Sequence, residues 1–248
     1  MMLEQFFKEN KRVAIAFSGG VDSAYLLYAA IQSNIDAKAY FVKSAFQPQF
    51  ELENAVTLAS QMGARMEVLE VDVLCKENIT ANPADRCYHC KKVIFETIAE
   101  AATKDGYPLL IDGTNASDDS ADRPGMKALT ELSVRSPLRE CGLTKDEIRR
   151  LSKEAGLFTW DKPAYACLAT RIPTSEAITL EKLRRTETAE NFLTSLGFVD
   201  FRIRSKDDAA KIQVTARDWS KIMENREAVF TQLKRYYKEV TLDLEVRK

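Results

Sequence analysis

Short apolar runs alternate with segments of helical periodicity through the first two thirds of the chain. Residues 13–17 form an apolar, β-rich run, and residues 22–32 place apolar side chains at spacings that give a helix a broad buried face. Further strands are expected at 37–43, 66–71 and 109–112, and further helices at 51–62 and 91–103. Strands that are separated by helices predict an α/β fold with a doubly wound parallel sheet, covered by helices on both faces.

The pattern becomes polar and turn-rich after the fourth expected strand. Residues 113–125 are typical of turns, and residues 132–136 are typical of an edge strand. A helix is expected over 145–155, where Thr144 begins it and Gly156 closes it.

A different order of elements follows Pro173. The pattern indicates a helix, two strands, a helix and a strand, over residues 180–196, 199–204, 211–216, 219–237 and 240–246. This order is typical of a small α+β unit. We therefore expect two domains, 1–173 with the doubly wound sheet and 174–248 with a role in substrate binding or oligomerisation.

Charge and cysteine usage narrow the class of protein. The 36 basic and 37 acidic residues nearly cancel, so the bulk charge gives no sign of a nucleic-acid partner or of an anionic membrane. The sequence shows no secretion signal and no apolar run of membrane-spanning length, and we expect a cytoplasmic protein. In a reducing compartment the five cysteines are expected to be thiols, metal ligands or catalytic groups. The single histidine, His89, leaves the chemistry to Cys, Asp, Glu, Lys and Arg.

The segment Ser-Gly-Gly-Val-Asp-Ser connects the first expected strand to the first expected helix. Such a connection points backbone N–H groups and the positive end of a helix dipole at one spot, where a pyrophosphate can bind. Gly19 and Gly20 are expected to reach positive φ, and the Ser18 and Ser23 hydroxyls to donate to phosphate oxygens. Asp22 is expected to hold Mg²⁺ or to cap the helix. The Gly-Lys-Ser/Thr ending of a Walker loop is absent, which disfavours a kinase or motor, and a plain strand-to-helix turn is the structural alternative.

This segment resembles the loop of the PP-loop superfamily, the N-type ATP pyrophosphatases. The resemblance implies an adenine nucleotide alpha hydrolase-like fold and the splitting of ATP into AMP and pyrophosphate. The segment after the fourth expected strand also resembles its counterpart in that superfamily, at the sheet edge where open α/β proteins bind ligands. It supplies Asp112, Thr114, Asn115 and Asp118 as further ATP-binding candidates. A turn rich in Asx residues is the alternative.

Three cysteines are candidates for a metal site. Cys87 and Cys90 lie three residues apart at the start of an expected helix, where the dipole favours thiolate. Cys167, in a segment flanked by Pro163 and Pro173, is the obvious third ligand. Three thiolates can hold a [4Fe-4S] cluster and leave one iron open for an exogenous ligand such as sulfide. A zinc site or separate thiols are the alternatives.

Over nearly its whole length the chain resembles the LarE family, the ATP-dependent sulfur transferases that mature the nickel-pincer cofactor of lactate racemase. The resemblance rests on the phosphate loop, residues 86–91, the segment after the fourth strand with Arg123-Pro124-Gly125, and above all Cys167-Leu168-Ala169-Thr170-Arg171-Ile172-Pro173. In family members with a single cysteine at the Cys167 position, that residue donates its own sulfur and is left as dehydroalanine. The two additional cysteines, Cys87 and Cys90, resemble the branch that passes on a cluster-bound sulfide.

The resemblance also implies a substrate, pyridinium-3,5-biscarboxylic acid mononucleotide. Its carboxylates are expected to be adenylylated and then converted to thiocarboxylates, with Cys167 as the catalytic cysteine. Arg171, Arg202 and Arg204 are the expected cationic partners of its phosphate and carboxylates. Arg202 and Arg204 share one face of an expected strand, and a solvated face is the alternative.

Two acidic residues and the partners of the chain complete what the family implies. Glu190 and Asp218 match acidic positions associated with the family's substrate site. A homo-oligomer and contact with the lactate racemase maturation proteins are further implications.

Two other functions are compatible with the same motifs. A tRNA thiolase of the PP-loop superfamily also uses a CxxC pair with a further cysteine, but an RNA substrate should bring a basic surface. A module that only binds nucleotide or metal is the other alternative, and pyrophosphate release would exclude it.

Overall fold

The computed structural model describes residues 2–118 and 124–247. Arg123 of the family motif lies outside the described residues. The chain forms two compact units, an N-terminal unit of Met1–Val73 and Asp85–Ala164 and a C-terminal unit of Leu74–Ala84 and Tyr165–Lys248. The sequence placed the border after residue 173 and gave no sign that residues 74–84 pack with the C-terminal part. That packing depends on contacts between residues far apart in the chain, which local patterns do not contain.

A four-stranded parallel sheet forms the centre of the N-terminal unit. The strand order is β3-β2-β1-β4, from β1 (Arg12–Ala16), β2 (Asp36–Lys43), β3 (Arg65–Glu70) and β4 (Leu110–Ile111). Because β2 and β4 lie on opposite sides of β1, the connections diverge at the carboxyl end of β1, where open α/β folds bind ligands. The predicted α/β fold with a parallel sheet is confirmed.

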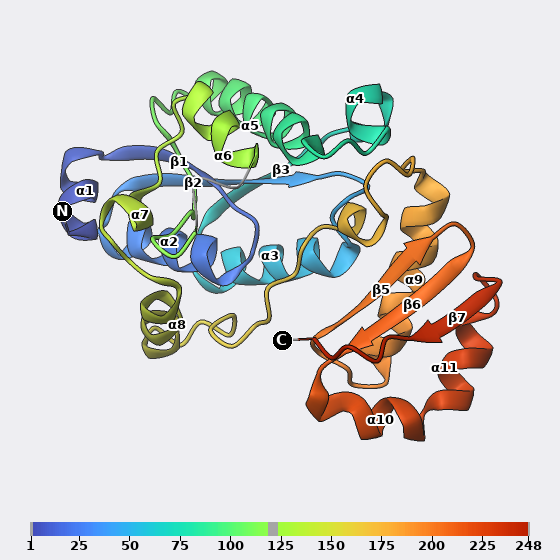
Figure 1. Ribbon diagram of the computed structural model, residues 1–248. Helices are drawn as coiled ribbons and strands as arrows, with labels where there is room; N and C mark the ends of the chain where they lie inside the picture. Colours follow the sequence, from blue (N-terminus) through green and yellow to red (C-terminus); the bar gives the residue numbers. More distant parts are fainter. Residues whose placement is uncertain (1, 119–123, 248) are drawn as a thin grey trace. The chain divides into compact units, whose positions relative to one another are not determined.

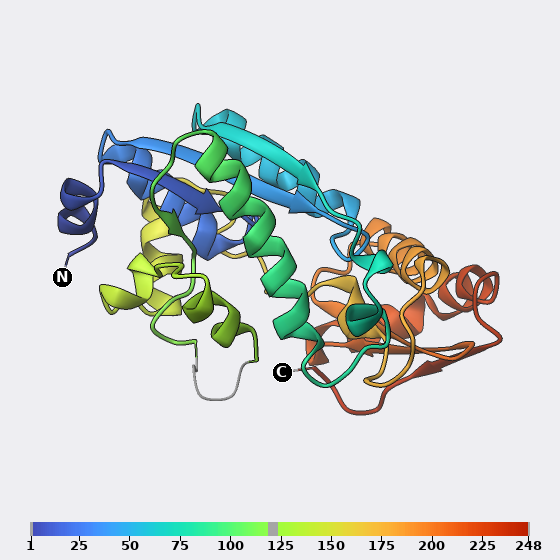
Figure 2. The same cartoon turned by 90° about the horizontal axis from the view of Figure 1, so that it is seen from above.

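Helices cover both faces of this sheet (Figure 1). Val13 and Ile15 point into one core, which α1 (Leu3–Glu9), α2 (Val21–Gln32) and α3 (Gln49–Gln61) complete. Ala14 points to the opposite face, because side chains alternate along a strand. There α5 (Arg86–Lys104) lies along the sheet, as the view from above shows (Figure 2), and α6 (Pro124–Glu131) packs beside it.

The predicted edge strand over 132–136 is wrong as a strand. Only one isolated bridge forms there, between Arg135 and Ile111. Ser133 has a positive φ of 54°, and Pro137 begins the short helix α7 (Pro137–Glu140). These two features leave no extended run between α6 and α7. The helix expected over 145–155 is present as α8 (Lys145–Glu154), and Thr144 and Glu147 form a capping box at its start.

The C-terminal unit is a three-stranded sheet with helices on its apolar face. The strands β5 (Phe201–Lys206) and β6 (Ala209–Val214) pair antiparallel, and β7 (Glu239–Leu242) pairs parallel with β6. Apolar side chains of the sheet pack with α9 (Leu180–Ser195), α10 (Trp219–Glu224) and α11 (Arg226–Leu233). The sequence predicted one helix over 219–237, but Asn225 interrupts it: this residue caps the end of α10 and precedes α11, and its side-chain amide donates to the Lys221 carbonyl at 2.9 Å.

Short helical segments complete the described residues. They are α4 (Glu77–Thr80) and the 3₁₀ turns η1 (Val73–Cys75), η2 (Leu168–Arg171) and η3 (Ala216–Asp218). No helix within residues 2–118 and 124–247 is both long enough and apolar enough to span a bilayer.

Candidate active site

The segment 18–23 forms a tight turn between β1 and α2. Gly19 has a φ of +70°, as expected, but Gly20 has an ordinary φ of −78° and precedes the first residue of α2, which corrects the expectation for Gly20. The Ser23 hydroxyl accepts a hydrogen bond from the Ser18 amide at 3.2 Å and lies 3.1 Å from the Ser18 hydroxyl. The first-turn amides of a helix have no carbonyl partner within it, so α2 presents donors where the chain leaves β1.

The segment that follows β4 packs directly on the first turn of α2. A Cβ on Gly113 would lie 2.8 Å from the Ser23 nitrogen and 3.1 Å from its Cα. Only glycine allows this close approach, and the approach joins the two polar segments that the sequence singled out.

We expect Gly113→Ala to lower the free energy of unfolding by about 1–3 kcal/mol, because its methyl group meets backbone atoms that cannot move aside. Urea unfolding followed by circular dichroism measures this change. Gly125→Ala is the matched control, since its Cβ would meet only the flexible Lys91 side chain, 2.6 Å from Cδ. Equal stability of the wild type and the Gly113→Ala protein would contradict the close approach.

Asp22 is held from two sides at the start of α2. Lys145 Nζ lies 2.5 Å from one carboxylate oxygen, and the Asn115 amide donates to the other at 3.3 Å. Lys145 is the first residue of α8, and its amide donates to the Ser117 hydroxyl at 3.0 Å. This residue was not among those predicted from the sequence. A lysine at the start of a helix opposes the dipole, and that misplacement was the available signal.

The remaining candidates after β4 form one hydrogen-bonded turn. The buried Asp112 carboxylate accepts from the hydroxyls of Thr114 at 2.5 Å and Ser136 at 2.6 Å. The Asp118 carboxylate accepts from the backbone amide of Asn115 at 3.1 Å. Asp112 and Asp118 therefore order the turn, while Asn115 contacts Asp22 directly.

A buried ion pair organises the polar residues of the C-terminal unit. Arg171 and Glu190 have side chains that are 0% and 5% exposed, and Arg171 donates to the carboxylate through Nε at 2.7 Å and Nη2 at 3.1 Å. Glu190 also accepts from the Tyr165 hydroxyl at 2.6 Å and from the Ile203 amide at 3.0 Å. Burial alone would lower the pKa of Arg171, but its hydrogen bonds and charge pairing with Glu190 raise it above the ordinary value.

Arg202 and Arg204 lie beside this pair on β5. The Tyr165 ring lies under both Arg171 and Arg202, whose guanidinium carbons are 4.6 and 5.3 Å from its centroid. Arg204 donates to the Thr170 carbonyl at 2.6 Å. Burial lowers the pKa of Arg202 to about 10, and repulsion from Arg171 is the second largest cause. The same two causes, in the same order, lower the pKa of Arg204. Arg202 is 6% exposed, so the alternative of a solvated strand face is wrong for this residue. With three arginines and one glutamate, the cluster carries more positive than negative charge.

Cys167 belongs to the same part of the C-terminal unit, and Asp218 does not join it. Cys167 directly precedes η2, is partly exposed, and its carbonyl accepts from the Thr170 hydroxyl at 2.8 Å. Asp218 accepts from the Thr215 hydroxyl at 3.0 Å before α10. This partner is a neighbour in the same turn, three residues before Asp218.

Cys87 and Cys90 lie in the first turns of α5, which begins at Arg86, five residues before the expected start. Their spacing puts the two Cβ atoms about 5–6 Å apart on one helix face. Cys87 is exposed, Cys90 is partly buried, and Arg86 Nη2 lies 3.6 Å from the Cys87 sulfur. Across residues 2–118 and 124–247, no group of three His, Cys, Asp or Glu side chains is gathered in the manner of a metal site. The two thiols by themselves supply half of a four-ligand set.

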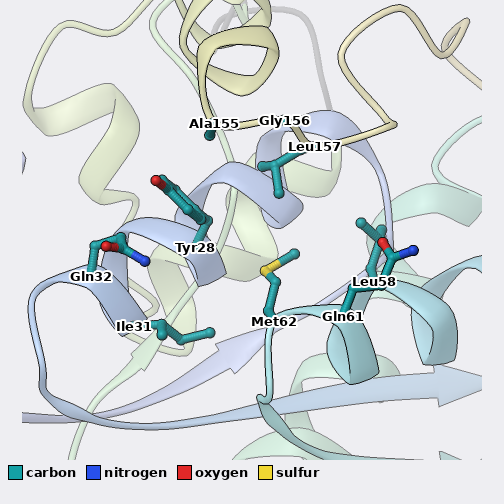
Figure 3. Close-up of a pocket in the computed structure, with 9 residues that line it drawn as sticks. All are labelled: Tyr28, Ile31, Gln32, Leu58, Gln61, Met62, Ala155, Gly156 and Leu157. Atoms are coloured by element: carbon teal, nitrogen blue, oxygen red, sulfur yellow. The ribbon is translucent and has the colours of Figure 1, made fainter.

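One hollow of about 270 Å³ lies at the other end of α2 from the phosphate loop (Figure 3). Tyr28, Gln32 and Met62 point into it, with Leu157 above them. Its lining contains no charged side chain. The hollow therefore lacks charged groups for acid–base or metal chemistry.

The chain is similar over nearly its full length to proteins of bacteria and an archaeon. It is 38% identical to an uncharacterised protein of Synechocystis sp., over 98% of this chain and 92% of that one. It is 31% identical to the pyridinium-3,5-bisthiocarboxylic acid mononucleotide synthase of Lactiplantibacillus plantarum, over 96% of this chain and 87% of that one. The chain belongs to the LarE family. This membership makes it an ATP-dependent sulfurtransferase and confirms the resemblance noted from its motifs.

Two further relatives of this LarE-family chain differ in how much of it they cover. The tRNA-specific 2-thiouridylase MnmA of Thermotoga maritima is 24% identical, over 59% of this chain and 52% of that one. An uncharacterised protein of Methanocaldococcus jannaschii is 32% identical over 98% of this chain and 93% of that one. No family model matches the chain. The MnmA likeness agrees with a PP-loop sulfurtransferase.

Proposed function

We propose that this protein converts the carboxylates of pyridinium-3,5-biscarboxylic acid mononucleotide into thiocarboxylates for the nickel-pincer cofactor of lactate racemase. The observation that carries the proposal is the near full-length similarity to a synthase of the bisthiocarboxylic acid mononucleotide. The phosphate loop and the arginine cluster, which suit ATP and an anionic nucleotide, support it.

The first step is adenylylation at the loop. ATP would bind with its phosphates at the start of α2, where first-turn amides and the Ser18 and Ser23 hydroxyls donate to them. A substrate carboxylate attacks the α-phosphorus, a P–O bond forms, and pyrophosphate leaves with the electrons of the broken bond. Asp22 suits Mg²⁺, because that ion prefers one or two carboxylates together with phosphate oxygens. Bound Mg²⁺ would neutralise the charge of the departing pyrophosphate.

The second step is sulfur transfer. A sulfur nucleophile attacks the acyl carbon of the mixed anhydride, and AMP leaves as the C–S bond forms. Arg171, Arg202 and Arg204 would orient the substrate phosphate and carboxylates, since an anion relieves the excess positive charge of the cluster. Glu190 would act by holding Arg171 in place. Asp218, which lies outside this hydrogen-bonded cluster, stays a candidate for substrate contact.

The reaction is tested with purified protein, ATP, Mg²⁺ and the dicarboxylate nucleotide. Pyrophosphate and a thiocarboxylate product, both absent without ATP, would support the proposal. Thiolation of tRNA with no reaction of the nucleotide would favour a tRNA thiolase, to which the MnmA likeness points. Absence of pyrophosphate with every substrate would leave a binding module.

The sulfur source is proposed to be a sulfide on a [4Fe-4S] cluster held by Cys87, Cys90 and Cys167. The CxxC spacing on α5 supports two of the ligands, and the third comes from the C-terminal unit. When bound, such a cluster would leave one iron open for an exogenous ligand such as sulfide.

Anaerobic reconstitution with iron and sulfide is expected to give about four irons per chain, and the Cys87→Ala and Cys90→Ala variants are expected to lose them. With the cluster bound, each chain is expected to form more than one molecule of thiocarboxylate product. No bound iron, one product per chain and a protein mass lower by one H₂S would instead identify Cys167 as a sacrificial donor. Cys75→Ala serves as the control for an exposed thiol outside the motif.

The setting of the protein follows from the same proposal. A reducing cytoplasm suits five cysteines whose thiols are needed as ligands or nucleophiles. A homo-oligomer and contacts with the lactate racemase maturation proteins stay proposals. Light scattering measures the first, and co-purification measures the second.

A further inference from the structure

The segment that follows α8 is fixed to that helix by one arginine. Arg149 Nη1 donates to the Trp160 carbonyl at 2.6 Å, and its Nη2 donates to the Lys162 carbonyl at 2.9 Å. The Lys162 amide donates to the Thr159 carbonyl at 3.1 Å, and Pro163 restricts the backbone of Lys162. The position from which the Lys162 side chain leaves the backbone is therefore set within the N-terminal unit.

Lys162 is a largely buried cation with an incomplete set of partners. Its Nζ lies 3.0 Å from Glu51 Oε1, and the two side chains are 18% and 13% exposed. That separation makes an ion pair, but neither atom has a hydrogen bond of acceptable direction in the described part of the chain. An ammonium group carries three donors. Lys162 thus has buried donor capacity that Glu51 does not use.

The ion pair lies close to the phosphate loop. Glu51 is in the first turn of α3, and Ala55 follows it one turn later on the same face, about 5–6 Å away between Cβ atoms. Ala55 packs against the loop, since a Cβ on Gly19 would lie 3.2 Å from the Ala55 Cβ. Lys162 therefore places a positive charge beside the segment that is proposed to hold the phosphates of ATP.

We propose that Lys162 is a nucleotide-binding residue, whose ammonium group donates to a phosphate oxygen of ATP and which Glu51 holds in position. This inference rests on the proposed binding of ATP at the loop. The competing interpretation is an ion pair that only fastens residues 157–163 to α3. The two interpretations differ in what the loss of each partner does to nucleotide affinity.

Binding of the non-cleavable analogue α,β-methylene-ATP with Mg²⁺, measured by calorimetry, separates them. Lys162→Met should raise the Kd at least about tenfold, as expected for the loss of a charged contact of about 1.4 kcal/mol, and Lys162→Arg should restore part of the affinity. Glu51→Gln should change the Kd much less than Lys162→Met, because the cation stays and the glutamine oxygen can still accept from it. Lys153→Met is the control, since Lys153 lies over the Trp160 ring at 4.4 Å and is exposed.

Urea unfolding of each variant shows that the measured protein is folded. An unchanged Kd in folded Lys162→Met, with destabilisation of both single variants, would overturn the inference and leave a structural ion pair. If the wild type binds the analogue but releases no pyrophosphate from ATP with the dicarboxylate nucleotide, the proposed function fails while the Lys162 contact is still decided by Kd. A wild type that does not bind the analogue would overturn both.

Discussion

A Cys167→Ser variant is expected to release pyrophosphate from ATP and yet to form no thiocarboxylate. The hydroxyl that replaces the thiol is neither a good nucleophile nor a good iron ligand at neutral pH, so product formation should fall by at least about 10³-fold. Adenylylation should continue, because the loop, Asp22 and Lys145 belong to the N-terminal unit. Product counting by mass spectrometry, beside a pyrophosphate assay, measures the two steps separately.

Cys141→Ser is the matched control for this experiment. Cys141 is also partly buried, but it lies in the N-terminal unit after α7, away from the motifs that carry chemistry. It should form thiocarboxylate at the wild-type rate. Full product formation by the Cys167→Ser protein would remove Cys167 from both proposed sulfur sources, and loss of pyrophosphate release in that variant would mean that the two steps are not separable.

Glu190→Ala is expected to destabilise the protein by about 3–5 kcal/mol, the cost of leaving a buried charge without its partner. Arg171 is fully buried, and Glu190 is the carboxylate that its Nε and Nη2 contact. The same substitution leaves the Tyr165 hydroxyl and the Ile203 amide without their acceptor. Urea unfolding measures the loss.

Two further variants give the Glu190 result its meaning. Glu190→Gln keeps an oxygen acceptor but removes the charge, so it should lose less than Glu190→Ala. Glu227→Ala removes an exposed carboxylate, 91% exposed in its pair with Arg226, and should change the stability by no more than about 0.5 kcal/mol. A loss in Glu190→Ala as small as in Glu227→Ala would show that the Arg171 pair contributes little.

Local patterns in the sequence were sufficient for the central sheet and for the phosphate loop. The apolar run that forms β1 and the helical spacing of α2 are both consequences of burying one or two faces. The edge strand expected after α6 failed because two local features, the positive φ of Ser133 and the start of α7 at Pro137, interrupt it. The break at Asn225 was missed for a related reason, since helical spacing continues across a side-chain cap.

The site residues divide in the same way between local and long-range causes. Gly19 and Asp22 belong to one short motif, so the local sequence was enough to predict them as site residues. Lys145 reaches Asp22 from a helix 123 positions further along the chain. A lysine at the start of a helix is a local signal, but it does not identify Asp22 as the partner. Tyr165 was also missed, although it is the ring on which the cations of the cluster stack.

The C-terminal unit contains residues made long before the rest of it. The Asn82 side chain donates to the Pro173 carbonyl at 2.6 Å, and the Asn82 backbone carbonyl accepts from the Ser175 amide at 2.8 Å. The Ile178 amide donates to the Thr80 carbonyl at 2.8 Å. During synthesis, residues 74–84 can therefore form these hydrogen bonds only after residues 173–178 have left the ribosome. A fragment that begins at residue 165 would lack this early segment and with it one side of these hydrogen bonds.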